Sequence, residues 1–237
     1  MKVLKFGGTS VGSAKVIQQV QAIVQQQAKQ EKVIVVVSAM SGTTDVLLNA
    51  GDLAAKGNED YKNFIQQIEQ RHLEAVKVLM PVQNQSSILS LIKKHCNEIE
   101  DLCKGIFLLQ ELSGRTKDKL VSYGELMSSQ MIAAAFNANG LPTTWKDSRE
   151  LIKTNSNFTN AQVIFSQTNT NIATFVEGVA TDVILLPGFI ASDDNNINTT
   201  LGRGGSDYTA AIVAAAVNAG SVEIWTDVSG MMTADPR

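Results

Sequence analysis

The sequence has few of the residues on which metal and disulfide chemistry depends. Its 237 residues include two cysteines and two histidines. Cys96 and Cys103 lie in a polar, helical context with six residues between them, which is not the spacing of a metal site. We do not interpret His95, beside Cys96, as a ligand. We therefore expect no metal bound directly by protein side chains, and free thiols typical of a reduced cytoplasm.

The chain also lacks a strong charge and a long apolar run. Lys and Arg number 20 against 23 Asp and Glu, which gives a net charge of −3 and argues against nucleic acid or an anionic membrane as the main partner. The opening residues 1–5 lack the apolar region of a signal peptide, and no apolar run reaches membrane-spanning length. We predict a cytoplasmic protein that binds neither nucleic acid nor membrane.

The common nucleotide-binding signatures are absent too. There is no G-x-x-x-x-G-K-[ST] sequence, and no G-x-G-x-x-G follows a strand. Instead, Lys5 interrupts an apolar opening strand and is followed by Gly7 and Gly8. A buried ammonium is costly without a partner, glycines let backbone N–H groups approach an anion, and a helix starting near Ser13 adds its positive end. This combination predicts a phosphate site, with an edge-strand lysine before an ordinary turn as the alternative.

The residue pattern predicts an α/β protein with a mostly parallel, open sheet between helices and a helical insert. Runs buried on both faces, such as 33–37, are typical of parallel strands. The helix predicted at 210–219 is apolar nearly all round, so we expect it to be fully buried. Strands are predicted at 2–6, 33–37, 142–146, 163–165, 183–187 and 222–225, with another candidate at 174–180, and helices at about 14–30, 44–55, 59–80, 85–104 and 116–139.

Polar loops follow several predicted strands, at 7–12, 38–44 and 226–230. Ligands of open α/β sheets bind outside the carboxyl ends of the strands, so these loops are where a site is expected. Thr226 and Asp227 could contact a ribose or base edge, or form an Asx-type turn before a glycine. Arg237 is a further candidate phosphate ligand.

The segment 202–207 opens the helix that follows it. Arg203 lies among three glycines at the helix N-terminus, a combination suited to binding a carboxylate or phosphate. Ser206 is expected to cap the helix, and Asp207 has an ordinary explanation in the helix dipole. Neither explanation accounts for Arg203, so the segment predicts an anion site.

Gly124 and Glu125 lie inside the helix predicted at 116–139. A glycine there costs roughly 1 kcal/mol relative to alanine, which indicates that another part of the chain or a ligand approaches closely. Glu125 would present its carboxylate to a cationic group. The alternative is a solvated glutamate beside a packing glycine.

Together these segments resemble the amino-acid kinase family, and specifically its aspartate kinase branch. They occur in the family's order over nearly the whole chain. The helical insert and the phrase at 105–109 most resemble the kinase half of bifunctional aspartate kinase–homoserine dehydrogenases. The segments are KFGGTSVG at 5–12, VSAMSGTT at 37–44, SYGE at 122–125, GRGGSD at 202–207 and WTDVSG at 225–230 with DPR at 235–237.

The resemblance implies ATP-dependent phosphorylation of the side-chain carboxylate of L-aspartate, the first step toward lysine, threonine and methionine. That carboxylate is already ionised at pH 7, so the lack of a catalytic-looking histidine agrees with it. Met232 stands where the family commonly has tyrosine. The resemblance assigns catalysis to Lys5 and Asp207, ATP binding to Lys5, Gly7, Gly8, Thr226, Asp227, Met232 and Arg237, and aspartate binding to Ser38, Thr44, Glu125, Arg203 and Ser206.

The resemblance also sets expectations for cofactors and organisation. Mg²⁺ would arrive bound to the ATP phosphates, and the full-length protein would be a homo-oligomer. We expect residues 1–237 to be a catalytic domain truncated near its C-terminal end, with weak or no activity and no inhibition by lysine or threonine. Its aspartate-binding lobe would span about 1–185 and its nucleotide-binding lobe about 186–237.

Two alternatives remain. Another kinase of the family could act on glutamate, acetylglutamate or a nucleoside monophosphate, and Glu125 discriminates because a free substrate ammonium needs an anion. A non-catalytic scaffold is the second alternative, and the joint presence of Lys5, Arg203 and Asp207 disfavours it.

Overall fold

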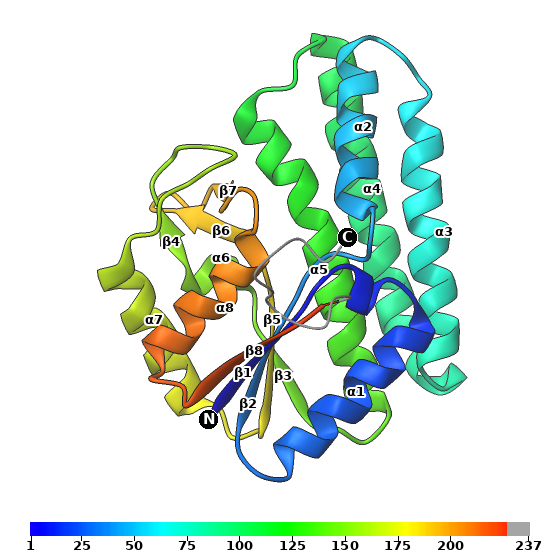
Figure 1. The fold of residues 1–237 in the computed structure, drawn as a ribbon. Coiled ribbons are helices and arrows are strands. Elements are labelled where there is room, and N and C mark those ends of the chain that lie inside the picture. The colour runs from blue at the N-terminus through cyan, green and yellow to red at the C-terminus, as the bar shows by residue number, and fades with distance from the viewer. Residues whose placement is uncertain (227–237) are drawn as a thin grey trace, which may run out of the picture.

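The computed structural model describes residues 1–226, which form an α/β fold around a five-stranded parallel sheet (Figure 1). The strand order is β3-β5-β2-β1-β8, so the strand that carries Lys5 lies between β2 and β8. The predicted mostly parallel sheet flanked by helices is confirmed. The strands are β1 (Lys2–Phe6), β2 (Val33–Val37), β3 (Thr143–Trp145), β5 (Val183–Pro187) and β8 (Ser221–Trp225).

Helices cover both faces of this sheet. Val33, Val35 and Val37 of β2 face a core shared with α1 and the bundle α2–α5, whereas Ile34 and Val36 face α7 and α8. This alternation explains why the strand is apolar throughout. The helices are α1 (Ala14–Ala28), α2 (Thr43–Ala55), α3 (Tyr61–Leu79), α4 (Ser86–Leu109), α5 (Gly114–Ala138), α6 (Ser148–Leu151), α7 (Phe165–Gly178) and α8 (Gly205–Ala216), with 3₁₀ turns at Thr9–Val11 and Val82–Asn84.

A second, three-stranded sheet lies beside the first. Its order is β4-β6-β7, with β4 (Lys153–Thr154) parallel to β6 (Ile190–Asp193) and β6 antiparallel to β7 (Asn198–Thr200). Asp193 accepts backbone hydrogen bonds from Asn195 and Ile197 within the turn that joins β6 to β7. Its strands β6 and β7 connect the end of β5 to the start of α8.

The predictions of strands at 163–165 and 174–180 are wrong. Val163 makes an isolated bridge to Thr154, and the chain then forms α7. Thr168, Ile172 and Val176 are buried at helical spacing against the core. The many threonine and asparagine residues around them have low helix propensity, and tertiary packing overrides it.

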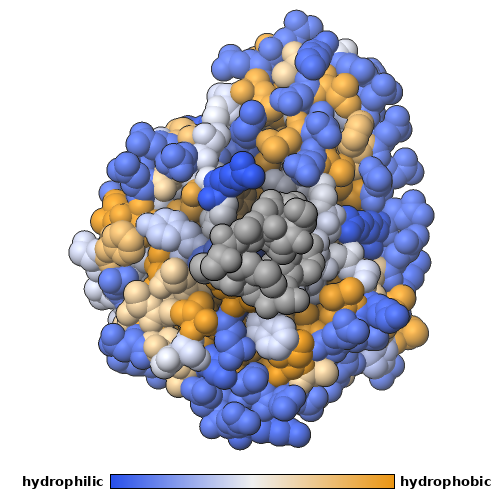
Figure 2. All heavy atoms as spheres, in the orientation of Figure 1, coloured by the Kyte–Doolittle hydropathy of each residue, from blue (hydrophilic) through white to orange (hydrophobic). Residues whose placement is uncertain are grey.

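The prediction that the helix near 210–219 is fully buried is also wrong. Ala210 and Val213 of α8 are buried, but Ala211 and Ala215 are exposed, and apolar patches over this helix are open in Figure 2. Alanine exposes little apolar surface, so an apolar helix of this composition tolerates a solvent face. At the β8 end of the sheet, Val222 and Ile224 are exposed as well.

Two further features of residues 1–226 bear on the sequence analysis. No helix there is both long enough and apolar enough to cross a membrane. Cys96 and Cys103 are free and buried in α4, and burial raises the pKa of each thiol to about 12. Both thiols are therefore protonated and unreactive at neutral pH.

Candidate active site

A cleft of about 510 Å³ lies at the carboxyl ends of the central strands. It is bounded by the loops that follow β1 and β2, by the middle of α5 and by the N-terminus of α8. Asp227, Met232 and Arg237 lie outside the described residues. The ten other predicted site residues all line this cleft: Lys5, Gly7, Gly8, Ser38, Thr44, Glu125, Arg203, Ser206, Asp207 and Thr226.

Lys5 projects from β1 into an ion pair. Its Nζ lies 2.7 Å from Oδ1 of Asp207, and Lys5 is 9% exposed. A Cβ added to Gly7 would lie 3.4 Å from the same Nζ, so the glycine leaves the ammonium accessible. The buried lysine therefore has a partner, and Asp207 does more than complement the helix dipole.

The two loops after β1 and β2 are bonded to one another. The Ser41 amide donates to the Gly8 carbonyl at 3.1 Å, and the Ser38 amide donates to the Phe6 carbonyl at 3.2 Å. A Cβ on Gly8 would lie 3.2 Å from the Ala39 carbonyl, a tight contact, so glycine favours this close approach. The helix α1 begins after Ser13, as predicted, but a 3₁₀ turn intervenes between it and Gly8.

Glu125 is a buried carboxylate rather than a solvated one. It is 3% exposed, and its only hydrogen bond within the described chain besides those of its own residue is a long one, 3.4 Å from the Ala39 amide to Oε1. Its Oε2 is buried and has no partner among residues 1–226, and burial raises the pKa of Glu125 to about 8. Gly124 allows this arrangement because an added Cβ would lie 3.1 Å from the Ala39 Cβ and 3.4 Å from Leu47 Cδ1.

The segment around Arg203 differs from the prediction in one respect. Gly204, with φ 74°, is the N-cap of α8, so Ser206 lies inside the first turn and does not cap the helix. Ser38 Oγ instead donates to Ser206 Oγ at 3.0 Å. A Cβ on Gly188 would lie 2.8 Å from Ser206 Cβ, which fixes how closely β5 meets α8. Arg203 is exposed and makes no ion pair within residues 1–226.

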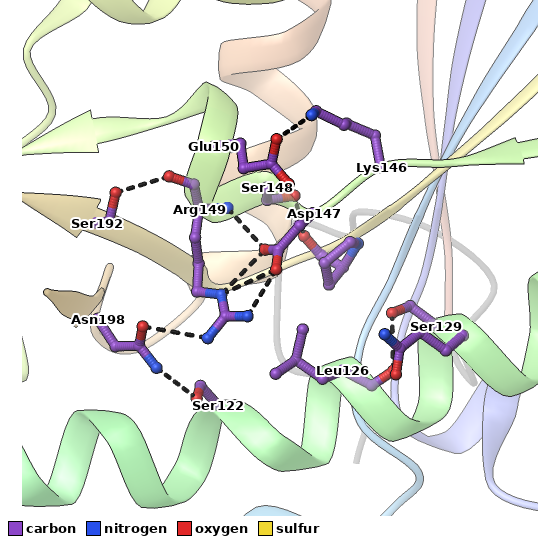
Figure 3. Close-up of polar contacts among 12 residues, drawn as sticks. Ser122, Leu126, Ser129, Lys146, Asp147, Ser148, Arg149, Glu150, Ser192 and Asn198 are labelled. Atoms are coloured by element: carbon purple, nitrogen blue, oxygen red, sulfur yellow. Dashed lines mark hydrogen bonds and ion pairs between the residues drawn. The ribbon is translucent and has the colours of Figure 1, made fainter. Parts of the chain in front are cut away.

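A polar network braces α5 near the cleft (Figure 3). Arg149 donates to both carboxylate oxygens of Asp147 and, at 3.1 Å, to Asn198 Oδ1. Asn198 in turn donates to Ser122 Oγ on α5, three residues before Glu125. The network therefore ties α6 and β7 to the helix that carries the buried carboxylate. The sequence analysis missed it because its members are far apart in the chain.

Phe189 also lines the cleft and was missed. Its φ of 68° lies in the left-handed region, which is unusual for an aromatic residue. The Phe189 amide donates to Thr209 Oγ1 at 3.0 Å, and its carbonyl accepts from the Leu201 amide at 3.0 Å, so the conformation is held from both sides. This position lies two residues after the strand predicted at 183–187, and no motif in the sequence assigned it a role.

Comparison with protein families places this cleft in context. A model described as the amino acid kinase family matches residues 1–237. A bifunctional aspartokinase/homoserine dehydrogenase 2 of Zea mays is 35% identical over 99% of this chain, and aspartokinase 3 of Arabidopsis thaliana is 35% identical over 99%. The chain spans 26% of the first relative and 42% of the second.

Solved structures of E. coli aspartokinase III have the same fold. One, in complex with aspartate and ADP, has a TM-score of 0.85 and 33% sequence identity to this protein. The match covers 100% of this chain and 51% of the aspartokinase III chain. Another, in complex with lysine and aspartate, has a TM-score of 0.86 and 32% identity with the same coverage. The similarity extends over every element that forms the cleft.

Proposed function

The chain belongs to the amino acid kinase family, and we propose that it transfers the γ-phosphate of ATP to the side-chain carboxylate of L-aspartate, giving aspartyl phosphate. One observation carries this proposal. A single cleft contains the paired cation Lys5, the exposed cation Arg203 and the buried, incompletely bonded carboxylate Glu125. A substrate with one ammonium and two carboxylates, beside a polyphosphate, is complementary to that set of charges.

The aspartate would be held by charge and hydrogen bonds. In this proposal Arg203 binds the α-carboxylate, since a guanidinium suits a carboxylate in two-point contact. Glu125 accepts from the ammonium, and Ser38, Thr44 and Ser206 supply hydroxyl groups nearby. The β-carboxylate is then directed toward the γ-phosphate as a nucleophile that needs no general base.

The nucleotide would bind at the end of β1. Gly7 and Gly8 let the backbone approach the phosphates, and Lys5 neutralises charge that develops as the phosphoryl group moves. Asp207 holds Lys5 in place through the 2.7 Å ion pair. Thr226, which lines the cleft, is proposed to contact the nucleotide together with Asp227, Met232 and Arg237.

Mg²⁺ is proposed to reach the site on the ATP phosphates. Asp45 and Asp207 line the cleft, and carboxylate oxygens are ligands that Mg²⁺ prefers. When bound, the ion would supply charge neutralisation at the phosphates. The protein's part in this proposal is to bind aspartate and ATP and to align the attacking oxygen.

The test is aspartate-dependent phosphoryl transfer. Aspartate, glutamate and acetylglutamate are each tested alone with Mg·ATP, and the acyl phosphate formed is trapped with hydroxylamine. ADP formation reports transfer to a nucleoside monophosphate, and lysine and threonine are added separately to the aspartate reaction. We expect aspartate to be the preferred acceptor, even if turnover is slow. Transfer to acetylglutamate in preference to aspartate would contradict the role of Glu125. ATP and aspartate binding without any transfer would favour the scaffold alternative.

We further propose the lobe division near residue 185, a weak activity, a homo-oligomeric full-length protein and the absence of nucleic-acid and membrane partners. Strand β8 shares a sheet with β1 across that lobe boundary. A cytoplasmic location is likewise a prediction, and some relatives are named as chloroplastic.

A further inference from the structure

Arg71 of α3 bridges two loops of the cleft from outside it. Its Nη1 donates to the Ser41 carbonyl at 2.5 Å, and its Nη2 donates to the Gly12 carbonyl at 2.8 Å. Arg71 does not line the cleft, and it makes no ion pair within residues 1–226. Its guanidinium is therefore directed at the backbone of the two loops.

The two bridged loops carry different parts of the proposed site. Loop 7–12 contains Gly7 and Gly8, which are proposed to meet the ATP phosphates. Loop 38–44, which runs into the first turn of α2, contains Ser38 and Thr44, both proposed to meet aspartate, and its Ala39 amide is the donor to Glu125. A guanidinium can bond two carbonyls at once because its N–H groups form a rigid fork, which a lysine ammonium lacks.

The helix that carries Arg71 is a firm support. The next residue, His72, is fully buried, and its Nδ1 lies 2.8 Å from the Ile68 carbonyl. Burial of this side chain fixes the rotation of α3 about its axis. The loops also meet directly, since a Cβ on Gly12 would lie only 3.3 Å from Ser41 Cβ.

We propose that Arg71 is a positioning residue that keeps the phosphate-binding loop 7–12 and the aspartate-binding loop 38–44 at a fixed separation. This inference rests on the proposed function. Because both loops depend on one side chain, loss of the guanidinium weakens binding of both ligands together. Loss of a residue that contacts only one ligand, such as Glu125, weakens one of them.

The test measures binding by calorimetry in the wild-type chain and in Arg71→Ala, Arg71→Lys and Lys77→Ala. Lys77 is an exposed cation of the same helix and is the matched control. The ligands are L-aspartate and a non-hydrolysable ATP analogue with Mg²⁺, titrated separately and well below the thermal unfolding midpoint of each variant. Each titration is repeated with guanidinium ion at a sub-denaturing concentration.

We expect Arg71→Ala to lose affinity for both ligands by about tenfold or more, since small misplacements of positioning groups can cost up to about 10²-fold. Arg71→Lys should lose less, Lys77→Ala should match the wild type, and guanidinium ion should restore part of the loss in Arg71→Ala alone. If Arg71→Ala does not fold, Arg71→Lys carries the test through a smaller parallel loss.

Three results would overturn the inference. In the first, affinities for both ligands stay within about twofold of Lys77→Ala. In the second, only one ligand is affected. In the third, the affinity of Arg71→Ala falls in parallel with its thermal unfolding midpoint, and guanidinium ion does not restore the affinity. A wild-type chain that binds neither ligand would instead overturn the proposed function, and this inference with it.

Discussion

Helix α5 buries two carboxylates in different surroundings. Asp118, 1% exposed, accepts hydrogen bonds from the Thr159 amide at 2.8 Å, the Thr200 amide at 3.1 Å and Thr200 Oγ1 at 2.8 Å. Glu125, two turns later and 3% exposed, accepts a single long hydrogen bond from another of the described residues. Burial of a carboxylate is costly unless donors are supplied. From this contrast we infer that Asp118 stabilises the fold, and we propose that Glu125 binds a ligand.

The pKa values express the same difference. Burial raises the pKa of both carboxyl groups, but at Asp118 hydrogen bonds from Thr159 and Thr200 oppose the rise. At Glu125 burial raises the pKa to about 8. A carboxyl group whose pKa is higher in the folded than in the unfolded protein stabilises the fold. This stabilisation is complete at a pH below the unfolded pKa and is lost as the pH rises through the folded pKa. The unliganded fold is therefore weakened by Glu125 at neutral pH.

Substitution of Glu125 should have the largest effect on binding. We expect Glu125→Gln to weaken aspartate binding by roughly 2–5 kcal/mol, because it removes one member of a buried charge pair. Affinity for the ATP analogue should be nearly unchanged. Separate titrations of the two ligands decide this, and a variant that loses nucleotide binding while it keeps aspartate binding would mean that the two pockets are exchanged.

Lys5 combines features of Asp118 and Glu125, since its charge is paired, as in a structural residue, but it lines the cleft. We expect Lys5→Ala to lower kcat by about 10²–10³-fold, with a smaller change in KM for aspartate, because one preorganised electrostatic group is lost. Steady-state hydroxylamine trapping of aspartyl phosphate at varied aspartate concentration gives both kcat and KM. A variant with more than about half of the wild-type kcat would refute the assignment.

Asp118 should affect stability instead. Asp118→Ala leaves the buried N–H and hydroxyl groups of Thr200 without an acceptor, each at a cost of about 1–3 kcal/mol, so we expect the free energy of unfolding to fall by roughly 2–6 kcal/mol. Glu125→Gln should raise it at pH 7, by roughly 3 kcal/mol at most, since folding at that pH must protonate Glu125, which is ionised in the unfolded chain. Urea unfolding of both variants provides the comparison. Equal destabilisation by the two substitutions would show that both carboxylates stabilise the fold, which would contradict the contrast between them.

The pH dependence of aspartate binding is a smaller effect. Below pH 8 Glu125 carries a proton in the free cleft, and the substrate ammonium needs the carboxylate, so binding should release that proton. Affinity should then rise with pH from 6 to 8 by up to about tenfold per unit, and level off above. Calorimetry in buffers of different ionisation enthalpy counts the protons. Glu125→Gln should show a flat profile, and a flat wild-type profile would contradict the raised pKa.

Much of the fold was predictable because its strands and helices have simple patterns. The valines of β2 are apolar at every position, since both faces of the strand are covered. The helix α7 was not predictable, because its threonine and asparagine residues conceal the buried positions Ile172 and Val176. Its helical state depends on packing against distant segments.

The site was predictable as a set of residues but not as an arrangement. Lys5 and Arg203 stand out against their local sequence, and resemblance to a family joined them. The pairing of Lys5 with Asp207 and the burial of Glu125 depend on contacts between segments far apart in the chain. The bonds from Arg71 to Gly12 and Ser41 leave no local signal, because the acceptors are backbone carbonyls.

We propose that Glu125 lacks a full set of donors among residues 1–226 so that it can receive the ammonium of aspartate. The most direct test compares binding of L-aspartate and N-acetyl-L-aspartate, which lacks that cation, to the wild-type chain and to Glu125→Gln. We predict that the wild type prefers aspartate by at least about 30-fold, as loss of a buried charge partner costs roughly 2 kcal/mol or more, and that the preference disappears in the variant. Equal binding of the two ligands by the wild type, or an undiminished preference in Glu125→Gln, would contradict the account.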